Sequence, residues 1–409
     1  MAKFQTLDDI DVRGKRVLLR ADLNVPVKDG VVTDATRIER LAPTIEALSE
    51  KRAKVIVMSH FGRPKGQPDP AYSLRPLVAP LSQAIGGRAV AFAEDCIGEK
   101  VKRVVAALRP GEVALLENLR FHKGEEANSP DFARALAELG DIYVDDAFSA
   151  AHRAHASIAA LAHLLPAAAG KLMEAELAAL NAALENPARP VMALIGGAKV
   201  STKLDLLCFV IGEVDLLAIG GAMANTLLFA EGKEVGRSLT ERDMAENARQ
   251  LLALAREHNC RVLLPEDAVI AAELAPGTLT RAVPIDMVPG DMMILDIGPK
   301  TVARIAAALE GARTLVWNGP LGAFETRPFD EATVAVAKKV GELTQAGKLL
   351  SVAGGGDTVA ALAAAGVTDR LSYVSTAGGA FLEWLEGREL PGVAALAAAA
   401  RTTPRGDAA

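Results

Sequence analysis

Short runs rich in β-branched apolar residues alternate with Ala- and Leu-rich helical stretches along the whole chain. This alternation is typical of parallel sheets that are covered by helices on both faces. Strands are expected near 16–20, 54–58, 113–117 and 141–145, and again near 191–195, 215–219, 261–264, 292–295, 313–317 and 349–353. We therefore predict an α/β fold with two doubly wound parallel-sheet domains.

The two sets of strands are separated by a stretch with helical periodicity. Met173, Leu177, Leu180 and Leu184 fall on one stripe, and Asn186 is followed by two nearby prolines. We expect a long interdomain helix over 171–186 with a hinge, a first domain over 1–170, a second over 187–390, and a C-terminal segment over 391–409. A single continuous sheet is the weaker alternative, because a chain of 409 residues usually divides its core.

The charge balance excludes a broad attraction to polyanions. Lys and Arg total 45 against 51 Asp and Glu, which gives a net charge of −6 and argues against nucleic acid or an anionic membrane as a partner. The charged amino terminus and the absence of a long uninterrupted apolar run predict a cytoplasmic protein. Cys96, Cys208 and Cys260 lie far apart without metal-ligand spacing to His, so they are interpreted as core residues in a reducing compartment.

Polar motifs follow the expected strands of the first half. In open α/β sheets ligands bind outside the carboxyl ends of the strands. The basic residues expected at this rim are Arg37, His60, Arg63, Arg120 and Arg153. Any one of them alone would be interpreted as a solvated charge, but their recurrence at successive strand ends favours a site for a small, multiply charged anion. Asp22 and Asn24 could hold a hydroxyl group or orient the arginines.

Glycine-rich turns follow the strands of the second half. The turns begin at Gly196, Gly220, Trp317, Gly354 and Ser375. Such turns let backbone amides approach phosphate closely. Each turn alone indicates only tight packing, and the chain has neither a Walker A motif nor a GxGxxG motif. The residues themselves therefore indicate an anion-binding domain and a nucleotide-binding domain, without identifying the substrate.

Four charged side chains of the second half extend this hypothesis. Lys199 and Lys203 are four residues apart at an expected helix start, where they would share one face and contact phosphate. Asp357 is expected at a helix amino terminus, where it could ligate Mg²⁺ carried by a nucleotide. Glu325 could accept hydrogen bonds from a ribose.

These motifs, in this order and spacing, resemble those of phosphoglycerate kinases over essentially the whole chain, from Arg20-Ala-Asp-Leu-Asn-Val-Pro to Leu390-Pro-Gly-Val-Ala-Ala-Leu. The resemblance implies that the first domain binds 3-phosphoglycerate or 1,3-bisphosphoglycerate and that the second binds MgADP or MgATP. It implies reversible, Mg²⁺-dependent phosphoryl transfer between 1,3-bisphosphoglycerate and ADP in glycolysis and gluconeogenesis. It further implies hinge closure, a monomer, and a C-terminal segment that returns towards the N-terminal domain.

The resemblance also assigns roles residue by residue. The positions implied to bind the phosphoglycerate are Asp22, Asn24, Arg37, His60, Phe61, Gly62, Arg63, Arg120 and Arg153. The positions implied to bind the nucleotide are Gly197, Ala198, Lys203, Gly221, Asn318, Pro320, Glu325, Gly355, Gly356, Asp357 and Thr358, with Asp357 as the metal ligand. Arg37 and Lys199 are expected to stabilise the transferring group, with help from the backbone amides of Gly378 and Gly379, which precede the last expected helix.

Three positions depart from the common pattern of the family. Ala222 and Ala377 stand where glycine is frequent, and Glu266 stands where an apolar residue is frequent. An alanine keeps its N–H, so amide donation survives if φ stays negative. Two other functions remain open at this point: another acyl-phosphate-forming kinase on the same architecture, and a nucleotide-binding scaffold without activity, which the presence of Arg37 and Lys199 disfavours.

Overall fold

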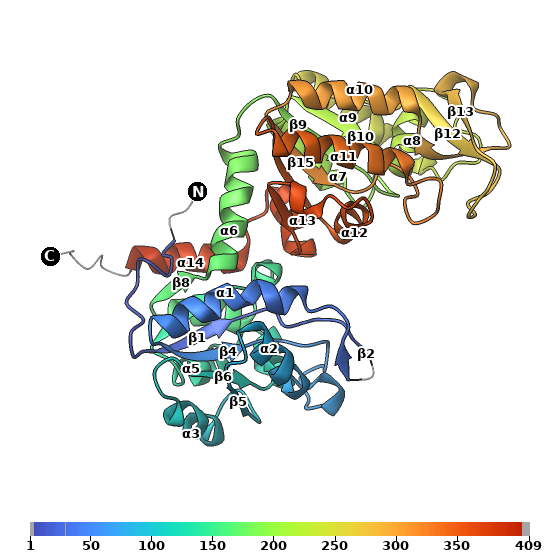
Figure 1. Cartoon of the computed structure of the whole chain (residues 1–409). Coiled ribbons are helices and arrows are strands. Elements are labelled where there is room, and N and C mark those ends of the chain that lie inside the picture. The colour runs from blue at the N-terminus through green and yellow to red at the C-terminus, as the bar shows by residue number, and fades with distance from the viewer. Residues whose placement is uncertain (1–3, 29, 403–409) are drawn as a thin grey trace. The chain divides into compact units, whose positions relative to one another are not determined.

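The computed structural model describes residues 4–28 and 30–402, which form two compact units (Figure 1). The first unit holds the described residues up to Leu177 together with those from Glu389 onwards, and the second holds Ala178–Arg388. The chain passes from one unit to the other within helix α6 (Lys171–Leu180), which continues as a π-helical turn, η7 (Asn181–Glu185). Residues 403–409 of the expected C-terminal segment lie outside the described residues.

The first unit is built on a six-stranded parallel sheet with the order β5-β6-β4-β1-β7-β8. Its strands are β1 (Arg16–Arg20), β4 (Lys54–Met58), β5 (Val90–Ala93), β6 (Val113–Leu116), β7 (Ile142–Asp145) and β8 (Ala167–Ala169). β1, β4, β6 and β7 are buried along almost their whole length, because both faces of the sheet are covered. β2 (Val27–Lys28) and β3 (Val31–Val32) form a separate small ladder.

Alternate residues of these strands point to opposite faces, so each face has its own apolar layer. Val17, Leu19, Val55 and Val57 belong to one cluster, which also contains the apolar stripe of α1. The helices of the unit are α1 (Thr36–Glu50), α2 (Val78–Ala84), α3 (Glu99–Ala107), α4 (Lys123–Glu126), α5 (Pro130–Ala137) and α14 (Pro391–Thr402). α1 packs against α2 and β4 on the same face (Figure 1).

The last described helix, α14, is part of the first unit although it follows the whole of the second in sequence. It packs against β8 and against two short helical turns, η5 (Ala156–Ala160) and η6 (Leu161–His163). The Gly392 N–H donates to the Ala151 carbonyl at 2.9 Å, and a Cβ at Gly392 would lie 2.9 Å from the Ile158 side chain. The start of α14 is thus seated closely on the first unit.

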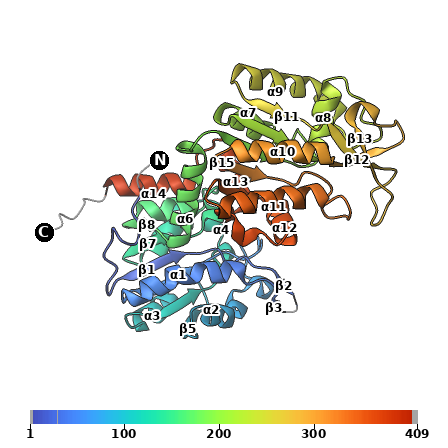
Figure 2. The ribbon, with the colours of Figure 1, turned by 45° about the horizontal axis from the view of Figure 1, so that its top comes forward.

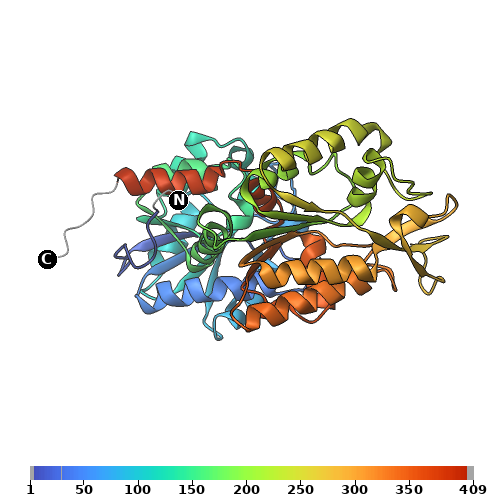
Figure 3. The ribbon, with the colours of Figure 1, turned by 90° about the horizontal axis from the view of Figure 1, so that it is seen from above.

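The second unit has its own six-stranded parallel sheet with the order β11-β10-β9-β15-β16-β17. Its strands are β9 (Val191–Ile195), β10 (Leu216–Ile219), β11 (Arg261–Leu263), β15 (Thr314–Asn318), β16 (Leu350–Gly354) and β17 (Tyr373–Ser375). Its helices are α7 (Leu204–Glu213), α8 (Gly221–Ala230), α9 (Ala245–Glu257), α10 (Pro299–Gly311), α11 (Glu331–Gln345), α12 (Gly356–Ala364) and α13 (Gly378–Leu385). Figures 2 and 3 show α9 on one face of this sheet and α10 and α11 on the other. The expected α/β class with two parallel sheets is confirmed.

One expected strand belongs to a different sheet. The stretch near 292–295 forms β14 (Met293–Ile297), which pairs antiparallel with β12 (Asp267–Ala271), and β12 also pairs antiparallel with β13 (Arg281–Pro284). The prediction that it extends the parallel sheet is wrong, because this three-stranded sheet has its own small core around Ala268, Ile270 and Ile285. No helix in the described part of the chain combines the length and the apolar character needed to cross a membrane.

Candidate functional site

The loops of the first unit that carry the basic motifs follow β6, β4, β1 and β7, which are consecutive neighbours in the sheet. Because all four strands are parallel, their carboxyl ends meet at one edge. The polar residues expected at the rim therefore come from adjacent loops. Arg37 joins them from the second position of α1.

A compact cluster of basic side chains lies at this edge. Burial, followed by the charges of Arg20, Arg120 and Arg153, lowers the pKa of His60 well below its usual value. Burial and the same three arginines lower the pKa of His155 to about 4. Both imidazoles are therefore neutral near pH 7, and the guanidinium groups hold a concentrated positive charge beside them.

Arg37 is held next to this cluster by an acidic partner. Its Nη1 donates to Asp22 Oδ2 at 2.8 Å and to the Asn24 carbonyl at 3.0 Å. Asp22 is nearly buried and also accepts a hydrogen bond from the Ser149 hydroxyl. The Arg37 side chain is still 35% exposed, so its guanidinium group is oriented by Asp22 and remains accessible to a ligand.

The segment from His60 to Gly62 is fixed by side chains from neighbouring loops. Asn118 accepts from the Phe61 N–H at 3.2 Å and donates to the Phe61 carbonyl at 2.7 Å. The Gly62 N–H donates to Asn24 Oδ1 at 3.0 Å, and Arg120 donates to the Gly62 carbonyl at 2.7 Å. Gly62 has φ +58°, and a Cβ there would lie 2.2 Å from the Tyr72 ring, so only glycine fits.

Arg63 and Arg153 complete the expected set in different ways. Arg63 is exposed, and Arg153 is partly buried with its Nε donating to His152 at 3.2 Å. Arg120 is almost fully buried, and its Nε lies 3.3 Å from Glu126. The structure thus gathers both buried and accessible cations at one edge.

Sequence reasoning missed the residues that support this cluster. Arg20 is fully buried; its Nε donates to the Ser157 hydroxyl at 2.8 Å and its Nη2 lies 3.2 Å from His60 Nδ1. Ser157 in turn donates to the buried carboxylate of Glu125 at 2.6 Å. The available signal was the presence of an arginine at the end of an otherwise apolar strand, where a buried charge requires partners.

The second unit gathers its glycine turns in the same way, at the carboxyl ends of β9, β10, β15 and β16. The Gly196 N–H donates to the Asn318 carbonyl and the Met223 N–H donates to the Gly197 carbonyl, both at 3.0 Å. A Cβ on Gly196 would lie 1.8 Å from the Pro320 oxygen, and one on Gly221 would lie 2.6 Å from the Gly197 oxygen. The turns therefore pack backbone against backbone, which only glycine allows.

Lys203 is partly buried among these glycine turns, which we call the glycine mesh. Its Nζ donates to the Gly196 carbonyl at 2.7 Å and to Asn318 Oδ1 at 2.6 Å. Burial lowers the pKa of Lys203 to about 8, an effect that the nearby Asp357 carboxylate opposes. Thr358 accepts a hydrogen bond from the Gly319 N–H at 2.7 Å, which connects the turn after β16 to the turn after β15.

A cavity of about 310 Å³ opens beside the mesh. Its lining includes six of the expected nucleotide-binding residues: Gly197, Ala198, Gly221, Pro320, Glu325 and Asp357. The cavity is not lined by the other five, which are Lys203, Asn318, Gly355, Gly356 and Thr358. Three of these five form hydrogen bonds within the glycine turns: Lys203, Asn318 and Thr358. The apolar side of the cavity comes from Leu239, Leu274, Met293 and Leu295, which sequence reasoning missed because no motif marks them.

One local expectation is wrong. Lys199 and Lys203 do not share a helical face, because α7 begins only at Leu204 and both lysines lie in the turn before it. Lys199 is exposed, whereas Lys203 points into the mesh. Gly378 and Gly379 are the first two residues of α13, and α14 follows them as the last described helix.

The departures from the family pattern are accommodated without strain. Ala377 has φ −85°, and its N–H donates to Ser375 at 3.1 Å. Ala222 is not among the described residues with positive φ. The Glu266 carboxylate lies 3.7 Å from Arg304, at the wall of a second cavity.

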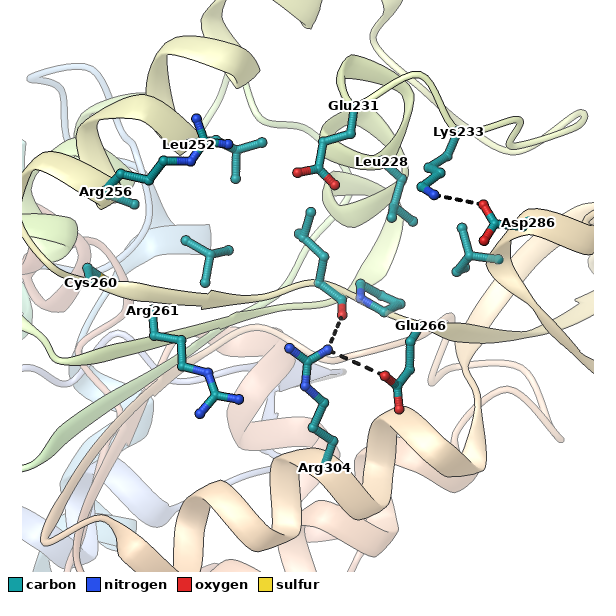
Figure 4. A pocket seen from close by; sticks show the side chains of 15 residues that line it. Leu228, Glu231, Lys233, Leu252, Arg256, Cys260, Arg261, Glu266, Asp286 and Arg304 are labelled. Carbon is teal, nitrogen blue, oxygen red and sulfur yellow. Dashed lines mark hydrogen bonds and ion pairs between the residues drawn. The ribbon is translucent and has the colours of Figure 1, made fainter.

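That second cavity, of about 500 Å³, also belongs to the second unit (Figure 4). It is lined by side chains of both charges, and Figure 4 shows Lys233 paired with Asp286 across one side of it, at 2.7 Å. None of the expected site residues lines it, and it has no glycine turn. It is therefore separate from the glycine-lined site.

A cluster of basic side chains at the edge of one parallel sheet and a glycine-lined cavity on a second are the features of a two-unit α/β phosphotransferase. The sequence model of the family described as phosphoglycerate kinase matches residues 7–388. A phosphoglycerate kinase from Methylorubrum extorquens is 62% identical over 399 residues, which are 97% of this chain and all of that protein. One from Rhodospirillum centenum is 61% identical over 395 residues, with the same coverage.

Solved structures agree with this result. The phosphoglycerate kinase of Coxiella burnetii superposes with a TM-score of 0.91 at 42% identity, covering 98% of this chain and all of that one. The enzyme from Pyrococcus horikoshii gives 0.78 at 30% identity, with the same coverage. The chain belongs to the phosphoglycerate kinase family. Its activity is that of a phosphotransferase with a carboxyl group as acceptor, in glycolysis and gluconeogenesis.

The packing of the glycine mesh gives a stability test. Gly196→Ala should lower the free energy of unfolding by about 1–3 kcal/mol or more, because its Cβ would collide with the Pro320 carbonyl. Gly311→Ala is the matched control, since nothing lies within 4 Å of a Cβ there and the residue ends α10. Urea titration of both variants compares them, and equal stabilities would contradict the proposed mesh.

Proposed function

We propose that the first unit binds 3-phosphoglycerate or 1,3-bisphosphoglycerate at the basic edge of its sheet. The second unit would bind MgADP or MgATP at its glycine turns. The phosphoryl group would pass reversibly between the two bound ligands. The observation that carries the proposal is the cluster of Arg20, Arg120 and Arg153 around neutral His60, with Arg37 beside it. A ligand with a carboxylate and a phosphate offers the negative charges that such a cluster needs.

The roles proposed for the first unit follow from exposure. Arg37, Arg63 and Arg153 retain accessible surface and would contact the phosphate and carboxylate groups. His60 would act as a neutral hydrogen-bonding group and not as a proton shuttle, because its pKa is far below 7. The Asn24 amide and the Asp22 carboxylate, which already hold the Gly62 N–H and Arg37, would orient the site and contact a substrate hydroxyl.

The nucleotide would occupy the 310 Å³ cavity, with its base against the apolar side chains of β14 and its ribose near Glu325. The backbone amides of the turns after β9 and β10 would contact the phosphates. Asp357, which is exposed at the second position of α12 and lines the cavity, would hold the Mg²⁺ that accompanies the nucleotide. The cation would neutralise phosphate charge when bound.

Transfer itself would need alignment and positive charge more than proton chemistry, because the attacking oxygen is already an ionised carboxylate or phosphate. Arg37 and the exposed Lys199 are the proposed groups that stabilise the transferring phosphoryl oxygens. The N–H groups of Gly378 and Gly379, at the start of α13, would donate to the same oxygens. Each ligand would bind its own unit, so closure of the hinge would be needed to bring the two ligands together. A monomeric state and a cytoplasmic location are also part of the proposal.

The activity and the roles of Arg37 and Lys199 are tested together. A coupled assay with 3-phosphoglycerate and MgATP should show turnover of the wild-type chain. Arg37→Ala and Lys199→Ala should each reduce kcat by roughly a hundredfold or more, because each removes a positive charge that stabilises the transferring phosphoryl oxygens. Lys348→Ala, at an exposed lysine, is the control. Turnover within a few-fold of wild type in either variant would remove that residue from the catalytic role.

The pKa of Lys203 gives a test through pH. Below about pH 8 its Nζ is charged and attracts phosphate, and above that pH it becomes neutral. Affinity for ADP should therefore fall by about tenfold between pH 7 and pH 9.5, a range in which the nucleotide phosphates are already ionised. Calorimetric titration of wild type and Lys203→Met measures this. The variant should bind weakly with little pH dependence, and an unchanged pH profile in it would exclude Lys203 as the cause.

A further inference from the structure

Three side chains with metal-binding chemistry meet in the first unit, and none of them is among the residues proposed to bind a substrate. Asp95 and Cys96 follow the end of β5, and His122 follows η3 (Leu119–Phe121), the turn after β6. β5 and β6 are parallel neighbours, and the Glu117 N–H donates to the Asp95 carbonyl at 3.4 Å. The carboxylate oxygen, the thiol sulfur and the imidazole nitrogen all lie within 4.8 Å of one another.

The ring of His122 is already aimed at the other two residues. Its Nε2 lies 2.7 Å from Asp95 Oδ1. The ring stacks on Phe132 with centroids 5.3 Å apart and planes at 28°, which fixes its orientation. Asp95 Oδ1 also accepts from the Cys96 N–H at 2.7 Å, so the carboxylate and the start of the next residue form one rigid unit. The donor atoms therefore need only small shifts to converge on one point.

The electrostatic surroundings favour a cation. The Cys96 thiol is fully buried. The carboxylates of Asp95, Glu125 and Glu117 lie near it and attract a divalent cation, which could replace the thiol proton. Asp95 and His122 are 47% and 30% exposed, so two of the three donor groups are accessible to an ion.

We propose that Asp95, Cys96 and His122 bind a zinc ion, with water at the fourth position. A thiolate, an imidazole and a carboxylate form a borderline-soft donor set that suits Zn²⁺, whereas Mg²⁺ and Ca²⁺ prefer oxygen ligands. Tetrahedral zinc with bonds of about 2.0–2.3 Å holds its donor atoms roughly 3.3–3.8 Å apart, and the three donor atoms here all lie within 4.8 Å of one another. The site lies two residues beyond Arg120 and is independent of the proposed Asp357 site.

Linear spacing concealed this site. Along the chain none of the cysteines has metal-ligand spacing to His, which is why all three were interpreted as core residues. The parallel pairing of β5 and β6 brings Cys96 and His122 together across the edge of the sheet. The competing interpretation is an Asp95–His122 ion pair that happens to lie beside a buried thiol, and it predicts no cysteine-dependent metal binding.

Cobalt(II) is the probe that separates the two interpretations, because a Co²⁺–thiolate bond gives a charge-transfer absorption in the near ultraviolet. Titrating Co²⁺ into the full-length protein under reducing conditions should give this band at one equivalent, and Zn²⁺ should displace it. Cys96→Ala should abolish the band. Cys260→Ala is the matched control, since Cys260 is also buried but has no such neighbours among the described residues, and it should retain the band.

Because Cys96→Ala leaves a gap in the core, a second variant tests the site at its accessible side. His122→Gln should keep the fold, as judged by circular dichroism, and should weaken Co²⁺ binding by about tenfold or more. Failure of wild type to give a charge-transfer band would overturn the proposal. A band that survives in Cys96→Ala, or a Co²⁺ affinity in His122→Gln equal to that of wild type, would also overturn it.

Discussion

The shared direction of the strands in each sheet is the constraint on which the rest of the structure depends. Because all pairings within the two six-stranded sheets are parallel, the loops after successive strands meet at one edge in each unit. In the first unit these loops carry arginines, and in the second they carry glycines. The same topology therefore produces two chemically different edges on one chain.

The two edges differ in the groups that they would offer to a negatively charged ligand. In the first unit several guanidinium groups lie close together, and their mutual repulsion is limited by the buried Glu125, by Asp22 and by keeping His60 neutral. In the second unit the glycine turns pack backbone against backbone, and one partly buried cation, Lys203, donates to the Gly196 carbonyl and to Asn318. Binding of an anion to the first unit would reduce the repulsion between its guanidinium groups. Binding of an anion to the second unit would use backbone amides that are already oriented.

The sequence predicted those parts of the fold whose signal is local. β1, β4 and β9 match their expected ranges because buried parallel strands are continuous apolar runs. β8 is only three alanines and β17 only three residues, so neither has a pattern that distinguishes it from a loop or helix. β14 has the composition of a core strand, but its antiparallel partners are set by tertiary packing. In the site, charged motifs were visible, whereas Arg20 and the apolar side of the cavity depend on neighbours distant in sequence.

If each unit has its own site, a substitution at one edge should change the affinity for one ligand and leave the affinity for the other ligand unchanged. Calorimetric titration of Arg153→Ala with 3-phosphoglycerate and, separately, with MgADP tests this most directly. The account predicts that affinity for 3-phosphoglycerate falls by about tenfold or more, while affinity for MgADP stays within twofold of wild type. An equal loss for both ligands, or unchanged binding of 3-phosphoglycerate, would contradict it.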